Sequence, residues 1–334
     1  MDILNANLGN LWFFLVGLFL ALALVMDGFD LGVGIISLFT PEEAAKKTLM
    51  ASVAPVWHAN LTWLVVAGGM LFGAFPGVYS LALSALYLPV ALLLFGLMAR
   101  GVGLEFHESV VHQPVTALAF GLGSLLTALA LGFVLGGWLN GLSPAAFASV
   151  GWRWLSPLGL AIAGAVVLLC VFLGACHLVD KAEGPLALAN RRWALLSLLA
   201  AVLAALGLFL WLRGRYPFLT ANWLAWPGFL YSLLPLLLGL VFLGVTARQL
   251  ARPEAGGLGL WSRLGGLFLS LGLAGSMFPY VAPPDLTVAA TASPIITLQV
   301  MLVGVAIFLP VMAAYNLFLY RVFRGKAGGG YAEH

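Results

Sequence analysis

The chain has 334 residues, of which 63% are hydrophobic and only 8% are charged, and its mean hydropathy is +1.07. A water-soluble globular domain carries about 25% charged residues, so this composition excludes a soluble enzyme and indicates an integral membrane protein. The formal net charge of +3 does not indicate nucleic-acid binding, because the basic residues are scattered among the loops.

Apolar runs of about 20 residues, the length needed to cross a bilayer, recur along the whole chain. Nine runs predict transmembrane helices, at approximately 11–38, 56–75, 79–99, 115–138, 156–178, 193–212, 228–247, 264–281 and 296–320. Pro, Gly and charged residues mark the breaks between them. The sequence therefore predicts an all-α polytopic membrane protein with a single integral membrane domain over 1–334. The first ten residues lack the positive segment of a cleaved signal peptide, so we expect them to be retained.

The basic residues are distributed unequally between the two sides of the predicted spans. Three lie on one side, at Arg153, Arg213 and Arg215. The loops after odd-numbered spans and the C-terminal tail hold the other twelve: Lys46, Lys47, Arg100, Lys181, Arg191, Arg192, Arg248, Arg252, Arg263, Arg321, Arg324 and Lys326. Because cytoplasmic loops are enriched in Lys and Arg, this asymmetry predicts an N-terminus outside and a C-terminus in the cytoplasm.

The first predicted span contains two carboxylates in the segment Met26–Ile35, MDGFDLGVGI. Asp27 and Asp30 are three residues apart and therefore share one helix face, in the cytoplasmic half of the span. A charged residue there costs roughly 2.5–3.5 kcal/mol on insertion scales and usually faces a protein interior or a water-filled path. Asp27 could instead cap or hydrogen-bond a neighbouring helix. Gly32 and Gly34 after Asp30 allow close helix packing, which favours a functional role for Asp30.

Two further protonatable side chains flank the next two spans on the same predicted side. His58 begins the second span and Glu105 follows the third, beside His107, Glu108 and His112. Carboxylates and imidazoles aligned within a membrane are typical of a proton relay, so the set predicts a proton path that opens to the cytoplasm. Alternatively, the residues around Glu105 form a solvated loop, and His58 is a packing residue or a haem ligand.

Other chemistry-bearing residues have simpler interpretations. The candidate partner of His58 in haem ligation is His177, but its neighbours Asp180 and Lys181 favour an interfacial position at the end of the fifth span. Cys170 and Cys176 lack metal-ligand spacing and are expected to be small apolar packing residues.

Taken together, these motifs resemble subunit II of the cytochrome bd-type quinol oxidases. The matching segments occur at both ends of the chain, while the middle, roughly 115–270, matches only in its span pattern. They are MDGFDLGVGI (26–35), APVWHANLTWLVVAGG (54–69), FPGVYS (75–80), RGVGLEF (100–106), MFPYVAPPDLTVAATASPIITLQVML (277–302) and LPVMAAYNLFLYRVFRGK (309–326).

The resemblance implies nine transmembrane helices, arranged as two four-helix bundles plus a peripheral helix, in the bacterial cytoplasmic (inner) membrane. It implies no haem in this chain and a partner subunit I that carries two b-type haems and one d-type haem, or a third b. That complex would oxidise quinol and reduce O2 to water with cytoplasmic protons. Small single-span accessory subunits, and a structural quinone or lipid bound to this chain, are further expectations.

The resemblance also bears on single residues. Asp30 matches the aspartate of the family's GFD motif, and Glu105 falls where members carry an acidic residue. Many members have Asp or Glu at position 58, so His58 is a departure that leaves the proton affinity of the path open. Trp63, Gly68 and Gly69 are expected to border an oxygen path or a subunit interface.

Three alternatives to this interpretation follow from the sequence. A proton-coupled secondary transporter is one, although no inverted repeat or pair of interrupted midplane helices is evident. A haem-bearing electron-transfer subunit using His58 or His177 with a Met ligand is the second. The third is a purely structural subunit whose acidic residues are assembly contacts.

Overall fold

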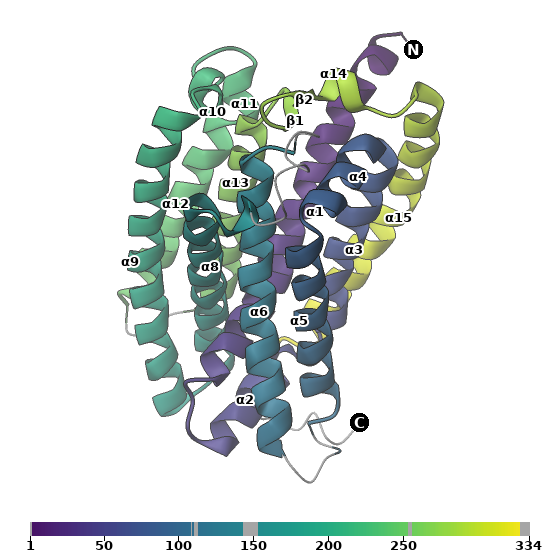
Figure 1. The fold of residues 1–334 in the computed structure, drawn as a ribbon. Helices are drawn as coiled ribbons and strands as arrows, with labels where there is room; N and C mark the ends of the chain where they lie inside the picture. The colour runs from purple at the N-terminus through teal and green to yellow at the C-terminus, as the bar shows by residue number, and fades with distance from the viewer. Residues whose placement is uncertain (1, 108, 110–112, 143–152, 253–255, 328–334) are drawn as a thin grey trace.

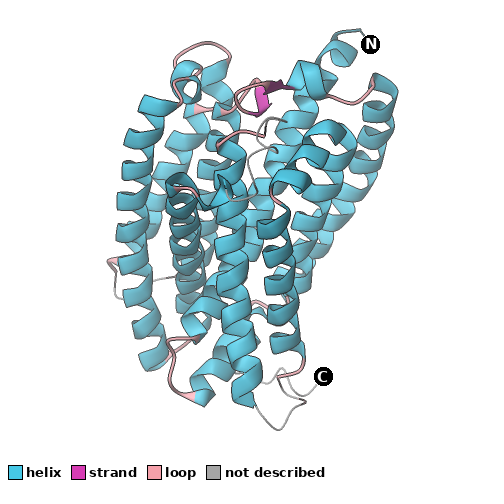
Figure 2. Cartoon of the chain, viewed as in Figure 1, coloured by secondary structure: helices cyan, strands magenta, loops and turns pink. Residues whose placement is uncertain are grey.

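A computed structural model of the chain describes residues 2–107, 109, 113–142, 153–252 and 256–327. The described part is almost entirely helical, as Figure 2 shows. Its helices are α1 (Asp2–Ser37), α2 (Glu43–Val53), α3 (Trp57–Ala74), α4 (Pro76–Ala85), α5 (Tyr87–Glu105), α6 (Gln113–Leu139), the 3-10 helix η1 (Arg153–Leu155), α8 (Pro157–Lys181), α9 (Gly184–Arg215), α10 (Phe218–Ala221), α11 (Gly228–Tyr231), α12 (Leu233–Leu250), α13 (Leu258–Ser276), α14 (Val288–Thr291) and α15 (Ile295–Val322). Two short antiparallel strands, β1 (Tyr280–Ala282) and β2 (Leu286–Thr287), form a hairpin.

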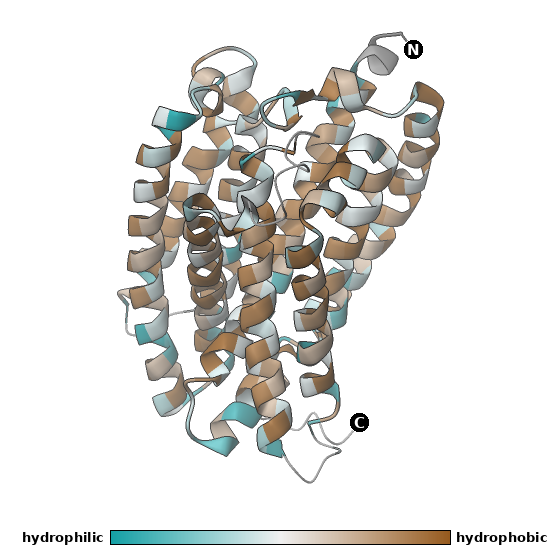
Figure 3. Cartoon of the chain, in the orientation of Figure 1, coloured by the Kyte–Doolittle hydropathy of each residue, from teal (hydrophilic) through white to brown (hydrophobic). Residues whose placement is uncertain are grey.

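The predicted all-α membrane architecture is confirmed. Within the described residues, eight helical segments are long and apolar enough to cross a bilayer. A ninth span results if α2 and α3, which meet at a bend of 53°, are counted as one broken span. Figure 3 shows apolar residues along the length of the helices and polar residues concentrated near their ends, notably on α2.

The structure differs from the predicted helix at 79–99. That stretch is divided between α4, which begins at Pro76, and α5, which begins at Tyr87. Pro89 explains the break because it has no N–H to donate to the carbonyl of Ala85, four residues earlier. In the first turn of a new helix that donor is not needed, so α5 begins here and continues to Glu105.

Helix α1 is the central element of the bundle, and glycines let its neighbours approach closely. A Cβ on Gly32 would overlap the carbonyl oxygen of Cys170 on α8, and one on Gly34 would overlap the side chain of Ser124 on α6. The glycines after Asp30 therefore permit helix crossings within this chain. By contrast, α9 and α15 bury few residues and lie at the edges of the bundle (Figure 1), where their apolar outer faces suit contact with lipid.

The two ends of the bundle carry different elements (Figure 1). The N-terminus, α10, α11, the β1–β2 hairpin and α14 lie at one end. Helix α2 and the C-terminal end of α15 lie at the other, which we call the α2 end. The buried apolar residues form two clusters, one around Phe29 and α8 and the other around Trp12 and α4. The candidate site lies near the first cluster, towards the α2 end.

Candidate functional site

Asp27 on α1 forms a buried ion pair with Arg100 on α5. The Nη2 atom of Arg100 lies 2.7 Å from Oδ1 of Asp27, and the two side chains are 1% and 6% exposed. These two atoms form an ion pair but not an aligned hydrogen bond, and neither of them has another hydrogen-bond partner. The guanidinium also lies 5.8 Å from the ring centroid of Trp57. Asp27 is thus committed to a specific countercharge inside the bundle.

Arg100 and Arg263 are therefore not the loop cations that the sequence analysis counted. Arg100 lies in α5 and is almost fully buried, and Arg263 lies in the second turn of α13. A cation near the end of an apolar run cannot be separated from a loop cation by hydropathy alone. The structure shows that two of the twelve charges used to predict the orientation have interior partners.

Asp30 belongs to a second buried group, formed with Asn60 on α3 and Tyr320 on α15. Nδ2 of Asn60 donates to Oδ2 of Asp30 at 2.9 Å, and the Tyr320 hydroxyl donates to Oδ1 of Asn60 at 2.8 Å. Asp30 and Asn60 are 1% and 0% exposed. Oδ1 of Asp30 is buried without a hydrogen-bond partner in the structure. An amide does not exchange protons readily, so Asn60 positions Asp30 and Tyr320 while Asp30 keeps one oxygen available.

His58 and Glu105 lie together but at the surface of the chain. Nδ1 of His58 is 3.8 Å from Oε1 of Glu105, and their side chains are 69% and 52% exposed. Nε1 of Trp57 donates to the same carboxylate oxygen at 3.2 Å, and its ring lies 3.8 Å from that of His58 between centroids. Glu105 is the last residue of α5 and not a loop residue. Buried Trp57 therefore contacts both this exposed pair and Arg100, the partner of Asp27.

The four predicted proton-path residues are thus brought to the same region in two groups. His58 and Glu105 form the exposed pair, while Asp27 and Asp30 lie inside with Arg100, Asn60 and Tyr320. The sequence analysis did not single out Asn60 or Tyr320. The sequence argument followed ionisable side chains, and Asn60 and Tyr320 are uncharged at neutral pH, but a polar Asn within an apolar span was an available signal.

Trp63, Gly68 and Gly69 do not line one common surface within this chain. Trp63 is 5% exposed, packs near the ring of Phe19, and has a buried Nε1 without a hydrogen-bond partner. Gly68 and Gly69 have no other atom within 4 Å of where a Cβ would stand. They leave open space along α3, whereas Trp63 points into the bundle.

His177 is buried and not interfacial, which corrects the expectation from its charged neighbours. It is 4% exposed, its Nε2 lies 3.2 Å from the carbonyl oxygen of Ser52, and its ring centroid is 4.6 Å from that of Phe29. Arg263 lies over the other aromatic groups here, 4.8 Å from Phe29 and 5.3 Å from Tyr320. The flanking Asp180 and Lys181 contact backbone groups of α13 and of the segment directly after α15, and so do not require His177 to be at the surface.

The remaining expectations concern metals and residues that are not described. Within the described ranges, no three His, Cys, Asp or Glu side chains are grouped so that they could hold a metal ion. Cys170 and Cys176 are buried and unbridged. Glu108 and His112, considered with Glu105 as a solvated loop, lie outside the described residues. His107 is buried, and its Nδ1 lies 2.9 Å from Oγ1 of Thr116.

Comparison with known proteins identifies close family relationships. The family model described as cytochrome bd terminal oxidase subunit II matches residues 8–323. Cytochrome bd ubiquinol oxidase subunit 2 of Bacillus subtilis is 39% identical over 108 residues, 32% of each chain. Cytochrome bd-I ubiquinol oxidase subunit 2 of Escherichia coli K12 is 32% identical over 193 residues, 54% of this chain and 51% of that protein. These alignments span about a third to a half of the relatives' length.

A solved structure extends the likeness in fold to nearly the whole chain. A chain in the structure of bd oxidase from Geobacillus thermodenitrificans superposes with a TM-score of 0.77 and 22% sequence identity. The match covers 95% of this chain and 98% of that one. At this identity the superposition establishes the shared fold.

Proposed function

The chain belongs to the cytochrome bd terminal oxidase subunit II family, and on that premise we propose that it is the haem-free second subunit of a bacterial quinol oxidase. The complex oxidises quinol and reduces O2 to water in the cytoplasmic membrane, with the haems and the quinol site in a subunit I partner. The family match over residues 8–323 is the observation that carries this proposal.

Within that complex, the chain lines a proton path whose carriers are Asp30, His58 and Glu105. The exposed His58–Glu105 pair takes up protons, and Asp30 holds them inside the bundle. Asp30 is better suited than Asp27, because Asp27 is committed to Arg100 while one oxygen of Asp30 has no partner. Asp30 is seven residues from the end of α1, about 10 Å at 1.5 Å per residue, so the buried carrier is within reach of that end.

Substitution of the buried carrier tests the path. Asp30→Asn should lower O2 consumption per assembled complex by about 100-fold, the lower end of what a positioned proton-transfer group contributes. Glu105→Gln should lower turnover less, because an exposed carboxylate is more easily replaced by water. Tyr320→Phe removes the hydroxyl that holds Asn60 and should therefore also lower turnover. Tyr315→Phe is its matched control and should leave turnover unchanged, since Tyr315 is 55% exposed on the same helix.

The readout is quinol-dependent O2 uptake normalised to the haem content of the purified complex. Turnover at the wild-type rate in assembled Asp30→Asn and Glu105→Gln double variants would contradict the proton role. Loss of assembly with unchanged turnover per complex would favour a purely structural subunit. Flux of a substrate through vesicles containing this chain alone would instead favour a transporter.

The haem-free assignment is supported by the surroundings of the two candidate ligands. Nε2 of His177 faces a backbone carbonyl, and His58 lies at the surface beside Glu105. An absorption spectrum of the isolated chain tests this assignment, since a stoichiometric Soret band would overturn it. The N-terminus-outside orientation is tested by reporter fusions to each end, for which we expect a cytoplasmic signal only at the C-terminus.

A further inference from the structure

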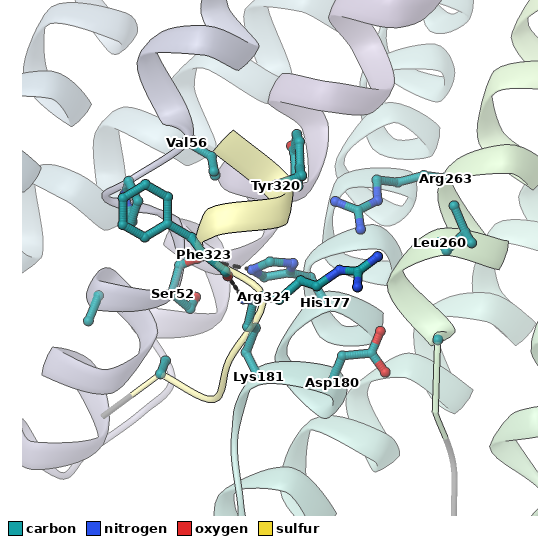
Figure 4. A pocket seen from close by; sticks show the side chains of 14 residues that line it. Ser52, Val56, His177, Asp180, Lys181, Leu260, Arg263, Tyr320, Phe323 and Arg324 are labelled. Carbon is teal, nitrogen blue, oxygen red and sulfur yellow. Dashed lines mark hydrogen bonds between the residues drawn. The ribbon is translucent and has the colours of Figure 1, made fainter. Parts of the chain in front are cut away.

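A cavity of about 300 Å³ lies at the α2 end; none of the proposed proton carriers lines it, although Tyr320, which holds Asn60, does. The ends of α2, α8, α13 and α15 converge around it, and its wall includes His177, Asp180, Lys181, Arg263, Tyr320 and Arg324 (Figure 4). Since α8 ends at Lys181, α13 begins at Leu258 and α15 ends at Val322, the cavity lies where membrane-crossing helices end. In a bilayer this is the depth of the lipid head groups.

The charge around the cavity is unbalanced. Asp180 contributes the carboxylate, but its two oxygens accept hydrogen bonds from the backbone N–H groups of Leu258 and Gly259, at 3.2 and 2.7 Å. Lys181 donates to the carbonyl oxygens of Phe323 and Gly325, which are neutral. Three cationic side chains therefore face one carboxylate that already caps a helix. No ion pair within 4.0 Å involves these cations in the described part of the chain.

Arg263 is held so that part of its guanidinium has nothing to bind. Its Nε donates to the carbonyl of Gly259 at 2.7 Å, and the rings of Phe29 and Tyr320 pack against the guanidinium. Its Nη1 atom is buried and has no hydrogen-bond partner in the structure. Figure 4 shows the guanidinium groups of Arg263 and Arg324 directed into the same space from α13 and from the end of α15. A buried, unpaired charged donor is costly unless a ligand satisfies it.

We propose that this cavity binds a phosphate group, presented by an anionic phospholipid or as free phosphate. The planar donors of arginine match phosphate oxygens in bidentate geometry, and basic pockets between helix ends are suited to lipid head groups. Arg263 and Arg324 hold the phosphate oxygens, Lys181 adds positive charge, and Asp180 keeps the beginning of α13 in place.

The test uses the complex as it is isolated from membranes, washed free of lipid in detergent. Native mass spectrometry measures binding of added phosphatidylglycerol, with phosphatidylcholine as the lipid of zero net charge. Titration calorimetry in phosphate-free buffer measures binding of inorganic phosphate. Arg324→Gln is the main variant because Arg324 is exposed and its loss should not impair folding. Arg321→Gln is the matched control, since Arg321 is also exposed near the end of α15 but does not line the cavity.

We expect one phosphatidylglycerol per chain, with affinity lowered at least about tenfold by Arg324→Gln, the size expected for one charge-assisted contact. Arg321→Gln should change affinity by less than about threefold, as for an exposed charge. The same pattern with inorganic phosphate alone supports the site and assigns it to free phosphate. Binding of neither probe, or equal losses in the two variants, overturns the proposal. The readout is binding, so the result is independent of whether the complex oxidises quinol.

Discussion

The buried ion pair between Asp27 and Arg100 gives the sharpest prediction about stability. At 2.7 Å, Coulomb attraction between unit charges is about 6 kcal/mol at an effective dielectric constant of 20. Burial of the two ions costs several kcal/mol each, so the intact pair contributes little net stability. Removal of one member is different, because the other charge then remains buried without a partner at a cost of about 3–5 kcal/mol.

We therefore expect Arg100→Met and Asp27→Asn to destabilise the assembled complex strongly as single variants, and the double variant to recover most of the loss. Methionine keeps an unbranched aliphatic side chain at this position, so the change is chiefly one of charge. The assay is the half-life of the purified complex at a fixed temperature, since large membrane complexes unfold irreversibly. A cost of 3 kcal/mol shortens that half-life by about 100-fold if the pair is broken in the unfolding transition state.

An exposed pair on α2 provides the control. Nζ of Lys46 and Oε1 of Glu43 are also 2.7 Å apart, the same distance as in the buried pair, but the side chain of Glu43 is 49% exposed. Glu43→Gln should therefore cost no more than about 0.5 kcal/mol, as is typical of a surface pair on one helix. The reasoning is refuted if Arg100→Met alone is as stable as the wild type, or if the double variant is no better than the worse single variant.

Two further predictions concern packing. Gly32→Leu should prevent assembly, because the leucine side chain would overlap the carbonyl of Cys170 on α8. Gly69→Ala should leave the fold of the isolated chain intact, because the space around its Cβ is open. The quantity of folded protein in detergent extracts measures both effects. Trp12→Phe should lower the stability of the folded chain by about 1 kcal/mol, because Nε1 of buried Trp12 donates to the carbonyl of Leu298 at 3.1 Å. A thermal midpoint equal to that of the wild type would contradict this.

The sequence predicted the helices better than their interruptions, for a physical reason. An apolar run long enough to cross a bilayer leaves few alternatives to a helix, so most of the expected spans have a counterpart in the structure. A break inside such a run depends on a single missing hydrogen bond. Pro76 was the conspicuous helix breaker, but Pro89 also ends a helix, and Pro310 lies inside α15 without ending it. Local sequence alone does not separate these outcomes.

Prediction of the site was limited by what hydropathy detects. Asp27 and Asp30 were conspicuous because a charge in hydrocarbon is costly, and the structure places both inside the bundle. Their partners were not conspicuous. Arg100 lies near the end of an apolar run, where a cation is ordinary, and Asn60 and Tyr320 are uncharged. Pairing between residues 30 and 260 positions apart is a property of tertiary packing, which no local pattern records.

The different surroundings of Asp27 and Asp30 explain how two neighbouring carboxylates on one helix face can differ in role. One buried arginine contacts Asp27, while Asp30 is held by the neutral amide of Asn60. Asp30 has no direct ion-pair partner, and an ionised carboxylate buried without one is costly unless a proton is bound. Asp27 is fixed by its countercharge, so the oxygen of Asp30 without a partner is the place where that proton is best accommodated. We therefore propose that Asp27 is the structural member of the pair and that Asp30 is the one that exchanges protons.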